Sequence, residues 1–181
     1  MPVDLLEALR SVPLHERDAW VDRFLGLADA VPDDAAELPR DAVPYLPCGV
    51  DAILRALKEA PVRPDDVFVD LGSGLGRPAL LAHLVTGARA IGVERQPHLV
   101  AQARACAERL GASGVQFIEG DATAVDVSEG TVFFIYSSFN GPALERVLTR
   151  LRRGVLCAVD FEVPGLKARA SSTPELVFYD L

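Results

Sequence analysis

One stretch of the chain, residues 67–78, reads VFVDLGSGLGRP and joins a short apolar run to three closely spaced glycines. The run from Val67 to Val69 predicts a strand that ends at Asp70, and Pro78 suits the first turn of a following helix. Glycines between them let the backbone turn tightly and let a ligand approach it, while the helix N-terminus offers N–H donors. The stretch therefore predicts a strand, a ligand-binding loop and a helix in succession.

The same alternation continues towards the C-terminus, where short apolar runs alternate with longer amphipathic segments. Strands that alternate with helices predict a parallel sheet with right-handed crossovers. We expect a Rossmann-like, doubly wound α/β fold with a mostly parallel sheet, and an antiparallel hairpin over residues 166–181 that turns at residues 171–174. The further strands are predicted at residues 90–93, 115–118, 131–136 and 155–159, and the helices at 78–85, 96–110 and 141–151.

Upstream of this region the pattern is first helical and then irregular. Two amphipathic helices are expected on either side of Pro13, and a proline-rich, acidic stretch over residues 31–47 suits neither a helix nor a central strand. Helical spacing resumes at residues 49–60. We divide the chain into N-terminal helices with a proline-rich lid or connector, residues 1–47, and an α/β domain, residues 48–181. The inward positions of the first two helices are predicted to be Leu5, Leu6 and Leu9, and Trp20, Phe24 and Leu27.

Composition limits the partners and the compartment. The 181 residues carry a formal net charge of −8, so no general basic field attracts nucleic acid, and a nucleic-acid partner is disfavoured. The cysteines, Cys48, Cys106 and Cys157, are too far apart for a disulfide framework or a zinc site. No secretory signal or membrane-spanning run is present in the sequence. We expect a cytoplasmic protein without a metal or a membrane partner, with Cys106 and Cys157 in the core and Cys48 able to reach the surface.

The spacing of the glycines separates two kinds of nucleotide ligand. A dinucleotide fingerprint, G-x-G-x-x-G, would need its third glycine at position 77, but the residue there is Arg77 and the glycine is Gly76. Glu94 ends the second predicted strand, eighteen residues after Gly76, where a carboxylate can accept hydrogen bonds from ribose hydroxyls. The pattern favours a nucleoside ligand over a dinucleotide. For the glycines alone, a tight turn without any ligand is the alternative.

The pattern Asp-x-Gly-x-Gly-x-Gly at residues 70–76, with an acidic residue ending the next strand, resembles motif I of the class I, seven-strand S-adenosylmethionine-dependent methyltransferases. Residues 119–122, Glu-Gly-Asp-Ala, resemble the acidic turn that meets the adenine in that family. The resemblance implies S-adenosyl-L-methionine as cofactor and S-adenosyl-L-homocysteine as product, with Glu94 at the ribose and Asp121 at the adenine amino group. The cofactor-binding residues that it implies are Tyr45, Asp70, Gly72, Ser73, Gly74, Gly76, Glu94, Arg95, Gly120, Asp121 and Ala122.

Shorter resemblances concern the methyl acceptor. Residues 65–76 resemble the non-SET histone lysine methyltransferases, the disruptor-of-telomeric-silencing family. Pro-Tyr-Leu-Pro at residues 44–47 is similar to a cofactor-covering segment of small archaeal protein lysine methyltransferases, and residues 161–165 resemble the stretch after strand five in those proteins. These resemblances imply protein lysine N-methylation. An enzyme that methylates a small-molecule metabolite and a noncatalytic S-adenosylmethionine-binding module are the alternatives.

The chemistry is expected where the fourth predicted strand ends, at residues 136–140. Methyl transfer from a sulfonium is an in-line displacement, so the site orients the acceptor lone pair and excludes water. A lysine acceptor must first lose its proton, which an apolar channel promotes. The residues predicted to act there are Tyr136, Ser137 and Asn140. Tyr45, Tyr136 and Phe139 could guide a cationic side chain by cation–π contact, with ordinary packing as the alternative for each.

Two further features bear on the acceptor. The chain has neither the Asn/Asp-Pro-Pro-Tyr type of segment found in methyltransferases of planar amines nor the Asn-Asn-Phe-Ala-Phe segment of the histone enzymes, which disfavours base methylation and a nucleosome substrate. A basic cluster stands out in this acidic chain, and we interpret it as a solvated helix end rather than a phosphate-binding patch. Its members are Arg146, Arg150, Arg152 and Arg153.

Overall fold

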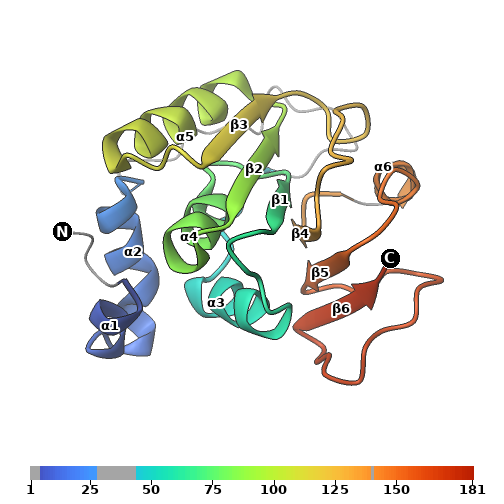
Figure 1. Cartoon of the computed structure of the whole chain (residues 1–181), viewed down its shortest axis with the longest axis horizontal. Helices are drawn as coiled ribbons and strands as arrows, with labels where there is room; N and C mark the ends of the chain where they lie inside the picture. The colour runs from blue at the N-terminus through green and yellow to red at the C-terminus, as the bar shows by residue number, and fades with distance from the viewer. Residues whose placement is uncertain (1–4, 28–43, 140) are drawn as a thin grey trace.

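A sheet forms the centre of the fold in the computed structural model, which describes residues 5–27, 44–139 and 141–181 (Figure 1). Its strands are β1 Val67–Leu71, β2 Arg89–Glu94, β3 Val115–Glu119, β4 Val132–Tyr136, β5 Val155–Val159 and β6 Leu176–Asp180. They lie in the order β3-β2-β1-β4-β5-β6. Neighbours among β1 to β5 pair in parallel, whereas β6 pairs antiparallel with β5 at one edge.

Helices pack on both faces of this sheet. They are α1 Leu5–Arg10, α2 Arg17–Leu25, α3 Val50–Glu59, α4 Arg77–Thr86, α5 Pro97–Leu110 and α6 Gly141–Leu148. On one face, Leu80 of α4 and Leu99 of α5 share a core with Phe68 and Phe134 of the sheet, and α1, α2 and α3 contribute to the same core. On the other face, Leu144 of α6 belongs to a second core with residues of β1, β2, β4, β5 and β6. The expected α/β fold with a mostly parallel, doubly wound sheet is confirmed.

The C-terminal part of the sheet differs from the expectation. Within the described residues the sheet has six strands, not the seven of the resembled family. Residues 166–181 form an irregular antiparallel hairpin whose turn lies later than the predicted residues 171–174, because isolated bridges join Ala168 to Tyr179 and Thr173 to Leu176. The reason is that β6 pairs along its whole length with the buried strand β5.

The N-terminal helices differ in which side chains face inward. Leu6 is 41% exposed, whereas Leu5 and Leu9 are buried. In α2 the buried stripe is Val21 and Leu25. The predicted inward pair, Trp20 and Phe24, lies one position away on the helix surface, where the two rings stack with their centroids 5.5 Å apart. The prediction was right for Leu27, which is buried in the core, and wrong for Trp20 and Phe24, which are half-buried and pack against the core from a neighbouring apolar stripe with the same i, i+4 spacing.

Candidate functional site

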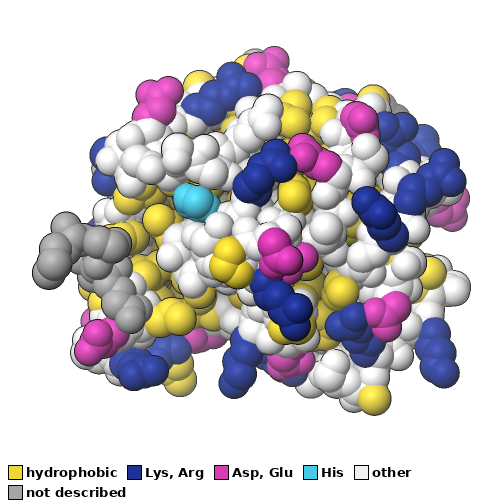
Figure 2. All heavy atoms as spheres, in the orientation of Figure 1, with side chains coloured by type: hydrophobic (Ala, Val, Ile, Leu, Met, Phe, Trp, Pro, Cys, Tyr) yellow, Lys and Arg dark blue, Asp and Glu magenta, His cyan; other side chains and the backbone are white. Residues whose placement is uncertain are grey.

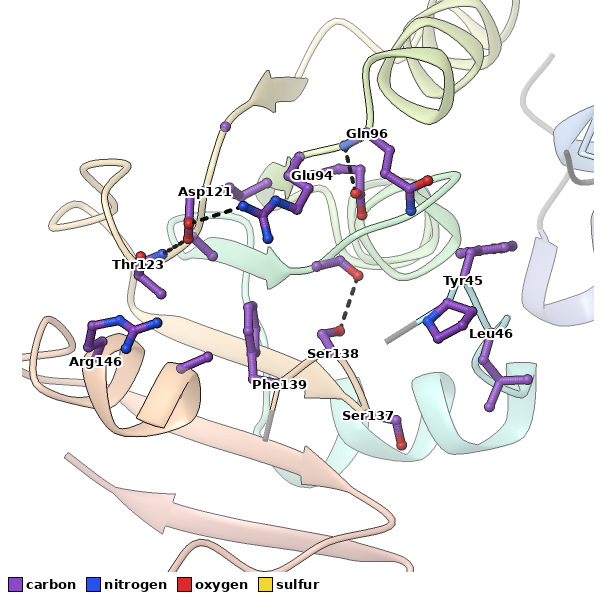
Figure 3. A pocket seen from close by; sticks show the side chains of 17 residues that line it. Tyr45, Leu46, Glu94, Gln96, Asp121, Thr123, Ser137, Ser138, Phe139 and Arg146 are labelled. Atoms are coloured by element: carbon purple, nitrogen blue, oxygen red, sulfur yellow. Dashed lines mark hydrogen bonds and ion pairs between the residues drawn. The ribbon is translucent and has the colours of Figure 1, made fainter. Parts of the chain in front are cut away.

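A cavity lies at the carboxyl ends of the parallel strands, where an α/β sheet usually binds its ligand. Figure 3 shows Asp121, Thr123 and Arg146 at one end of it and Tyr45 and Ser137 towards the other, with residues that follow β1 and β2 between them. The residues lining it are Pro44, Tyr45, Leu46, Gly72, Val93, Glu94, Arg95, Gln96, Gly120, Asp121, Ala122, Thr123, Ser137, Ser138, Phe139, Ala143 and Arg146.

The loop between β1 and α4 contributes Gly72 to the lining of this cavity. The N–H groups of Gly72 and Ser73 donate to the carbonyl of Val93 at 2.9 and 3.0 Å, which continues the β1–β2 pairing into the loop. Gly72 and Gly74 have φ angles of 81° and 52°, in the left-handed region that favours glycine. A Cβ atom on Gly72 would collide with Ser138, and one on Gly74 would collide with the Tyr45 ring. The spacing of the glycines therefore reflects close approach of protein side chains as well as backbone conformation.

Glu94 connects this loop to the end of β2. Its Oε2 accepts a hydrogen bond of 2.9 Å from the Gly74 N–H, and its Oε1 accepts one of 2.9 Å from the Gln96 N–H. The side chain lines the cavity, although the residue is only 9% exposed. A carboxylate oxygen can accept two hydrogen bonds, so each oxygen retains capacity for a ligand donor. Glu94 thus holds the loop and presents an acceptor to the cavity.

Asp70 lies behind the loop, inside β1, and does not line the cavity. It is 2% exposed, and its Oδ2 has no hydrogen-bond partner among the described residues. Burial raises the pKa of Asp70 to about 8, a hydrogen bond from the Ala79 N–H opposes that shift, and the nearby charge of Glu94 adds to it. A buried carboxyl with an unpaired oxygen fits a cationic ligand group, because such a group would supply the missing partner and favour the ionised form.

Asp121 lies at the end of the cavity away from Tyr45, among cationic and hydrogen-bonding neighbours. Its Oδ1 accepts a hydrogen bond of 2.8 Å from the Thr123 N–H, and its Oδ2 lies 3.6 Å from Nη2 of Arg95 (Figure 3). Partial burial raises the pKa of Asp121, but the Thr123 hydrogen bonds, Arg95 and Arg146 together lower it below its ordinary value. This carboxylate is therefore ionised at neutral pH and can accept a hydrogen bond from an amino group.

Tyr45 borders the other end, packed over Gly74. Burial raises the pKa of Tyr45 to about 12, although the positive charge of Arg77 opposes the shift. The phenol is therefore neutral at physiological pH and presents an aromatic face and a hydroxyl. The neighbouring Cys48 is buried, and burial raises the pKa of its thiol far above the ordinary value. The expectation that Cys48 reaches the surface is wrong, since the chain before α3 turns inward against α4.

The ends of β4 and β5 carry an unusual backbone conformation. Ser137 and Asp160 have φ angles of 44° and 63°, which non-glycine residues seldom adopt. Ser137 follows Tyr136, and Asp160 follows Val159. Since Tyr136 and Val159 are paired in the sheet, the two strained residues lie next to each other at the carboxyl ends of β4 and β5. Strain of this kind collects at functional sites. Burial, followed by the charges of Cys48 and Asp160, raises the pKa of Tyr136.

Some of the residues predicted for the site line the cavity, and others do not. The predicted residues that line it are Tyr45, Gly72, Glu94, Arg95, Gly120, Asp121, Ala122 and Ser137. The predicted residues that do not line it are Asp70, Ser73, Gly74, Gly76 and Tyr136. Ser73 is buried, Gly76 adjoins the Phe117 ring, and Tyr136 is half-buried against the core that contains α3 and α4. Asn140 lies outside the described residues.

Several lining residues were not predicted as site residues. Ser138 lies two residues after β4, and Gln96 and Thr123 lie within two residues of predicted acidic positions, so a wider window around each strand end would have included them. Phe139, which was predicted only as a cation–π contact for the acceptor, also lines the cavity. Ser138 donates a hydrogen bond of 2.8 Å to the Tyr136 carbonyl. Arg146, from the basic cluster, enters the cavity from α6, and only the packing of α6 on the sheet brings it there.

In the described ranges, no three His, Cys, Asp or Glu side chains are grouped as metal ligands. Likewise, none of the helices in the described part of the chain has the length and apolar character needed to cross a bilayer.

Known proteins are similar to this chain in sequence and in fold. A family model described as a methyltransferase domain matches residues 68–156, from β1 to β5. A protein-lysine N-methyltransferase from Saccharolobus islandicus (strain REY15A) is 31% identical over 128 residues, covering 68% of this chain and 80% of that protein. A sterol 24-C-methyltransferase from Pneumocystis carinii (strain B80) is 30% identical over 98 residues, covering 52% of this chain and 26% of that protein.

One solved structure is matched over most of its length. The crystal structure of an RNA methyltransferase from Salinibacter ruber in complex with S-adenosyl-L-homocysteine has a TM-score of 0.64 and 31% sequence identity. The match covers 75% of this chain and 92% of that chain. The names of these relatives specify different methyl acceptors, while the methyltransferase domain is common to them. The chain therefore belongs to the class I S-adenosylmethionine-dependent methyltransferases, and S-adenosyl-L-methionine is its cofactor.

Proposed function

We propose that this methyltransferase transfers the methyl group of S-adenosyl-L-methionine to a lysine side chain of a protein. The observation that carries the proposal is the likeness to the protein-lysine N-methyltransferase, which extends over 80% of that protein. The resemblance of residues 44–47 to the cofactor-covering segment of archaeal lysine methyltransferases supports it, because Pro44, Tyr45 and Leu46 border the cavity. We assign residues 44–47 as the described part of a lid; the rest of the proposed connector, residues 31–43, lies outside the described residues.

The cofactor is proposed to lie along the cavity with its adenine near Asp121. The ionised Asp121 carboxylate can accept from the adenine amino group, and Glu94 can accept from the ribose hydroxyls. The methionyl part would then lie over Gly72, with its ammonium group towards the unpaired oxygen of Asp70. This orientation directs the sulfonium methyl group to the end of the cavity that is bordered by Tyr45 and Ser137 (Figure 3).

The acceptor side suits an amine that is cationic in solution. Asp160 directly follows β5, and its carboxylate, near enough to raise the pKa of Tyr136, can attract an ammonium group at the strand ends. The aromatic rings of Tyr45 and Phe139 border the cavity and can contact the side-chain stem and its charge. Nearness to the sulfonium charge and removal from water both favour loss of the lysine proton. When bound, S-adenosyl-L-methionine would supply the methyl group: the lysine nitrogen, with its proton released to solvent, would accept the methyl carbon as the carbon–sulfur bond breaks, and S-adenosyl-L-homocysteine would leave.

RNA is the second candidate acceptor because of the likeness to the Salinibacter ruber RNA methyltransferase. The basic cluster on and after α6 favours it locally, and Figure 2 shows Lys and Arg side chains gathered where α6 lies. The net charge of −8 opposes it, since the protein as a whole repels a polyanion and only a local basic patch could release counterions. A small-molecule acceptor and a noncatalytic cofactor-binding module are the two remaining hypotheses, and the experiment below distinguishes both from lysine methylation.

The proposal is tested by incubating the purified protein with methyl-tritiated S-adenosyl-L-methionine and a lysate of its host, then separating protein, RNA and small molecules. We expect label in the protein fraction, released as methyllysine on acid hydrolysis. The Gly72→Ala variant is the control, because its Cβ atom would collide with Ser138 in the lining of the cavity. Label recovered in RNA or in a small molecule other than the added cofactor in place of protein, or no label above that of the control, would refute lysine methylation.

A further inference from the structure

Arg77 is the first residue of α4 and directly follows the glycine loop, yet its side chain is only 4% exposed. Its Nη2 lies 2.6 and 2.5 Å from the two carboxylate oxygens of Asp22 in α2, and its Nε donates to the same carboxylate at 3.0 Å. Its Nη1 donates a hydrogen bond of 2.6 Å to the backbone carbonyl of Cys48. One guanidinium therefore joins three segments that are far apart in the sequence.

This placement conflicts with the local preference of a helix. A positive charge at a helix N-terminus opposes the helix dipole, and the first turn of α4 has no acidic residue to compensate. The compensation comes instead from α2, through Asp22 and, at 3.7 Å, through Asp18. A local rule broken in favour of a tertiary contact marks a position where the fold serves a function.

The segment that Arg77 holds is the one that borders the cofactor cavity. Cys48 follows Tyr45 by three residues, and the Tyr45 ring packs over Gly74 in the loop that ends just before Arg77. The same segment is held at its far end by Asp18, whose Oδ1 accepts a hydrogen bond of 2.7 Å from the Val50 N–H at the start of α3. Residues 44–50 are thus tied to α2 and to α4 on the side away from the cavity.

We propose that Arg77 is a positioning residue for the cofactor: its contacts with Asp22 and the Cys48 carbonyl hold residues 44–48 over the glycine loop and make α2 part of the cofactor site without touching the cofactor. The inference rests on the proposal that the cofactor binds in this cavity. It does not depend on which molecule accepts the methyl group. Without these contacts, residues 44–48 would leave the arrangement that places Tyr45 against Gly74.

The first test measures the affinity of the Arg77→Met variant for S-adenosyl-L-homocysteine by calorimetry. If the variant populates the wild-type arrangement of residues 44–48 only one-tenth of the time, the apparent dissociation constant rises about tenfold. The matched control is Arg17→Met. It removes a different ion pair of α2, the one in which Arg17 lies 2.5 Å from Asp51 near the start of α3. We expect the control to bind like the wild type.

A second variant separates positioning from simple stabilisation. Removing both charges, with Arg77→Met and Asp22→Leu together, leaves no unpaired buried charge and restores much of the thermal stability that Arg77→Met alone loses. The Cys48 carbonyl still lacks its donor, so we expect weak cofactor affinity to persist and hydrogen exchange of residues 44–48 to stay fast. This variant also provides the test if Arg77→Met alone fails to fold.

Wild-type affinity in either folded variant would overturn the positioning role. A loss of affinity that the double variant regains together with its stability would overturn it as well, because the effect would then be one of stability alone. If the Arg77 variants bind weakly while Glu94→Ala binds like the wild type, the proposed placement of the ribose fails and the positioning role stands.

Discussion

Glu94 combines two tasks in one carboxylate, since it accepts hydrogen bonds from Gly74 and Gln96 and lines the cavity. We predict that Glu94→Ala weakens binding of S-adenosyl-L-homocysteine by about 10- to 150-fold, because a hydrogen bond to a charged group is worth about 1.5–3 kcal/mol. Isothermal titration calorimetry measures the change. The control is Glu119→Ala, which removes the carboxylate paired with Glu94 in the β2–β3 register but outside the cavity. Equal affinities of the two variants would contradict the ribose assignment.

Asp70 makes the stability of the ligand-free protein depend on pH. Its folded-state pKa of about 8 lies above the ordinary value of 3.8, so the folded protein binds more protons than the unfolded chain between these values. The contribution of Asp70 to stability is therefore fully present below about pH 4 and is lost as the pH rises through about 8. We predict that the unfolding free energy of the wild type, relative to Asp70→Asn, falls between pH 5 and pH 8 and then levels off.

Urea denaturation of both proteins at several pH values provides this measurement, and the difference between them cancels the other titrating groups. A difference that stays constant from pH 5 to pH 9 would mean that Asp70 is ionised throughout. Saturating S-adenosyl-L-methionine should flatten the dependence, because its ammonium group would favour the ionised carboxylate.

At the scale of the element, the glycine loop is shaped by what packs on it. Gly74 has a φ of 52°, and the Tyr45 ring packs directly against it. Gly111, which follows the last residue of α5, has a similar φ of 63°, but a Cβ atom there would meet no other atom within 4 Å. We predict that Gly74→Ala abolishes or severely weakens cofactor binding, since the new methyl group must displace Tyr45. Gly111→Ala imposes a similar backbone cost of about 1 kcal/mol and should leave affinity unchanged.

Cofactor titration and thermal melting of both alanine variants distinguish backbone strain from steric collision. Strain alone would lower the melting temperatures of the two proteins to a similar degree and leave both affinities intact. Only collision with Tyr45 predicts an affinity loss confined to Gly74→Ala.

The α2 helix shows how an element predicted as a separate extension enters the main fold. Its buried residues, Val21 and Leu25, belong to the same core as α3, α4 and one face of the sheet. Its acidic residues, Asp18 and Asp22, contact the start of α3 and the start of α4. The hydrophobic side of α2 therefore anchors it, and its acidic side faces the elements that border the cofactor cavity.

At the scale of the whole molecule, the net charge of −8 is expected to guide the choice of acceptor. The acidic protein would attract a lysine-rich acceptor electrostatically. Salt shortens the range of this attraction, because the Debye length falls from about 30 Å at about 0.01 M salt to about 8 Å at about 0.15 M. We predict that kcat/KM for a basic protein acceptor falls over this range, while cofactor affinity changes little. A rate that is insensitive to salt would argue against a basic macromolecular acceptor, and a neutral metabolite would give that result.

The order of strands and helices followed from the sequence because each element has its own periodic signal and its own glycine or proline boundary. The end of the second strand at Glu94 was predicted correctly, whereas β1 and β3 each extend one residue beyond their predicted ends, to Leu71 and Glu119. The inward side of α2 and the turn before β6 were not predictable, because two apolar stripes on the helix are equivalent in spacing and the pairing of β6 with β5 is a long-range choice.

For this protein, the sequence alone determined the α/β class, the glycine loop and the acidic strand ends, because backbone conformation and hydrophobic periodicity are local properties of the chain. Only the tertiary structure decided that Tyr45 packs on Gly74, that Arg146 reaches the cavity from α6, and that Arg77 joins α2 to residues 44–48. These contacts bring together residues from distant segments. Their geometry depends on how helices pack against the sheet, and no local pattern encodes that packing.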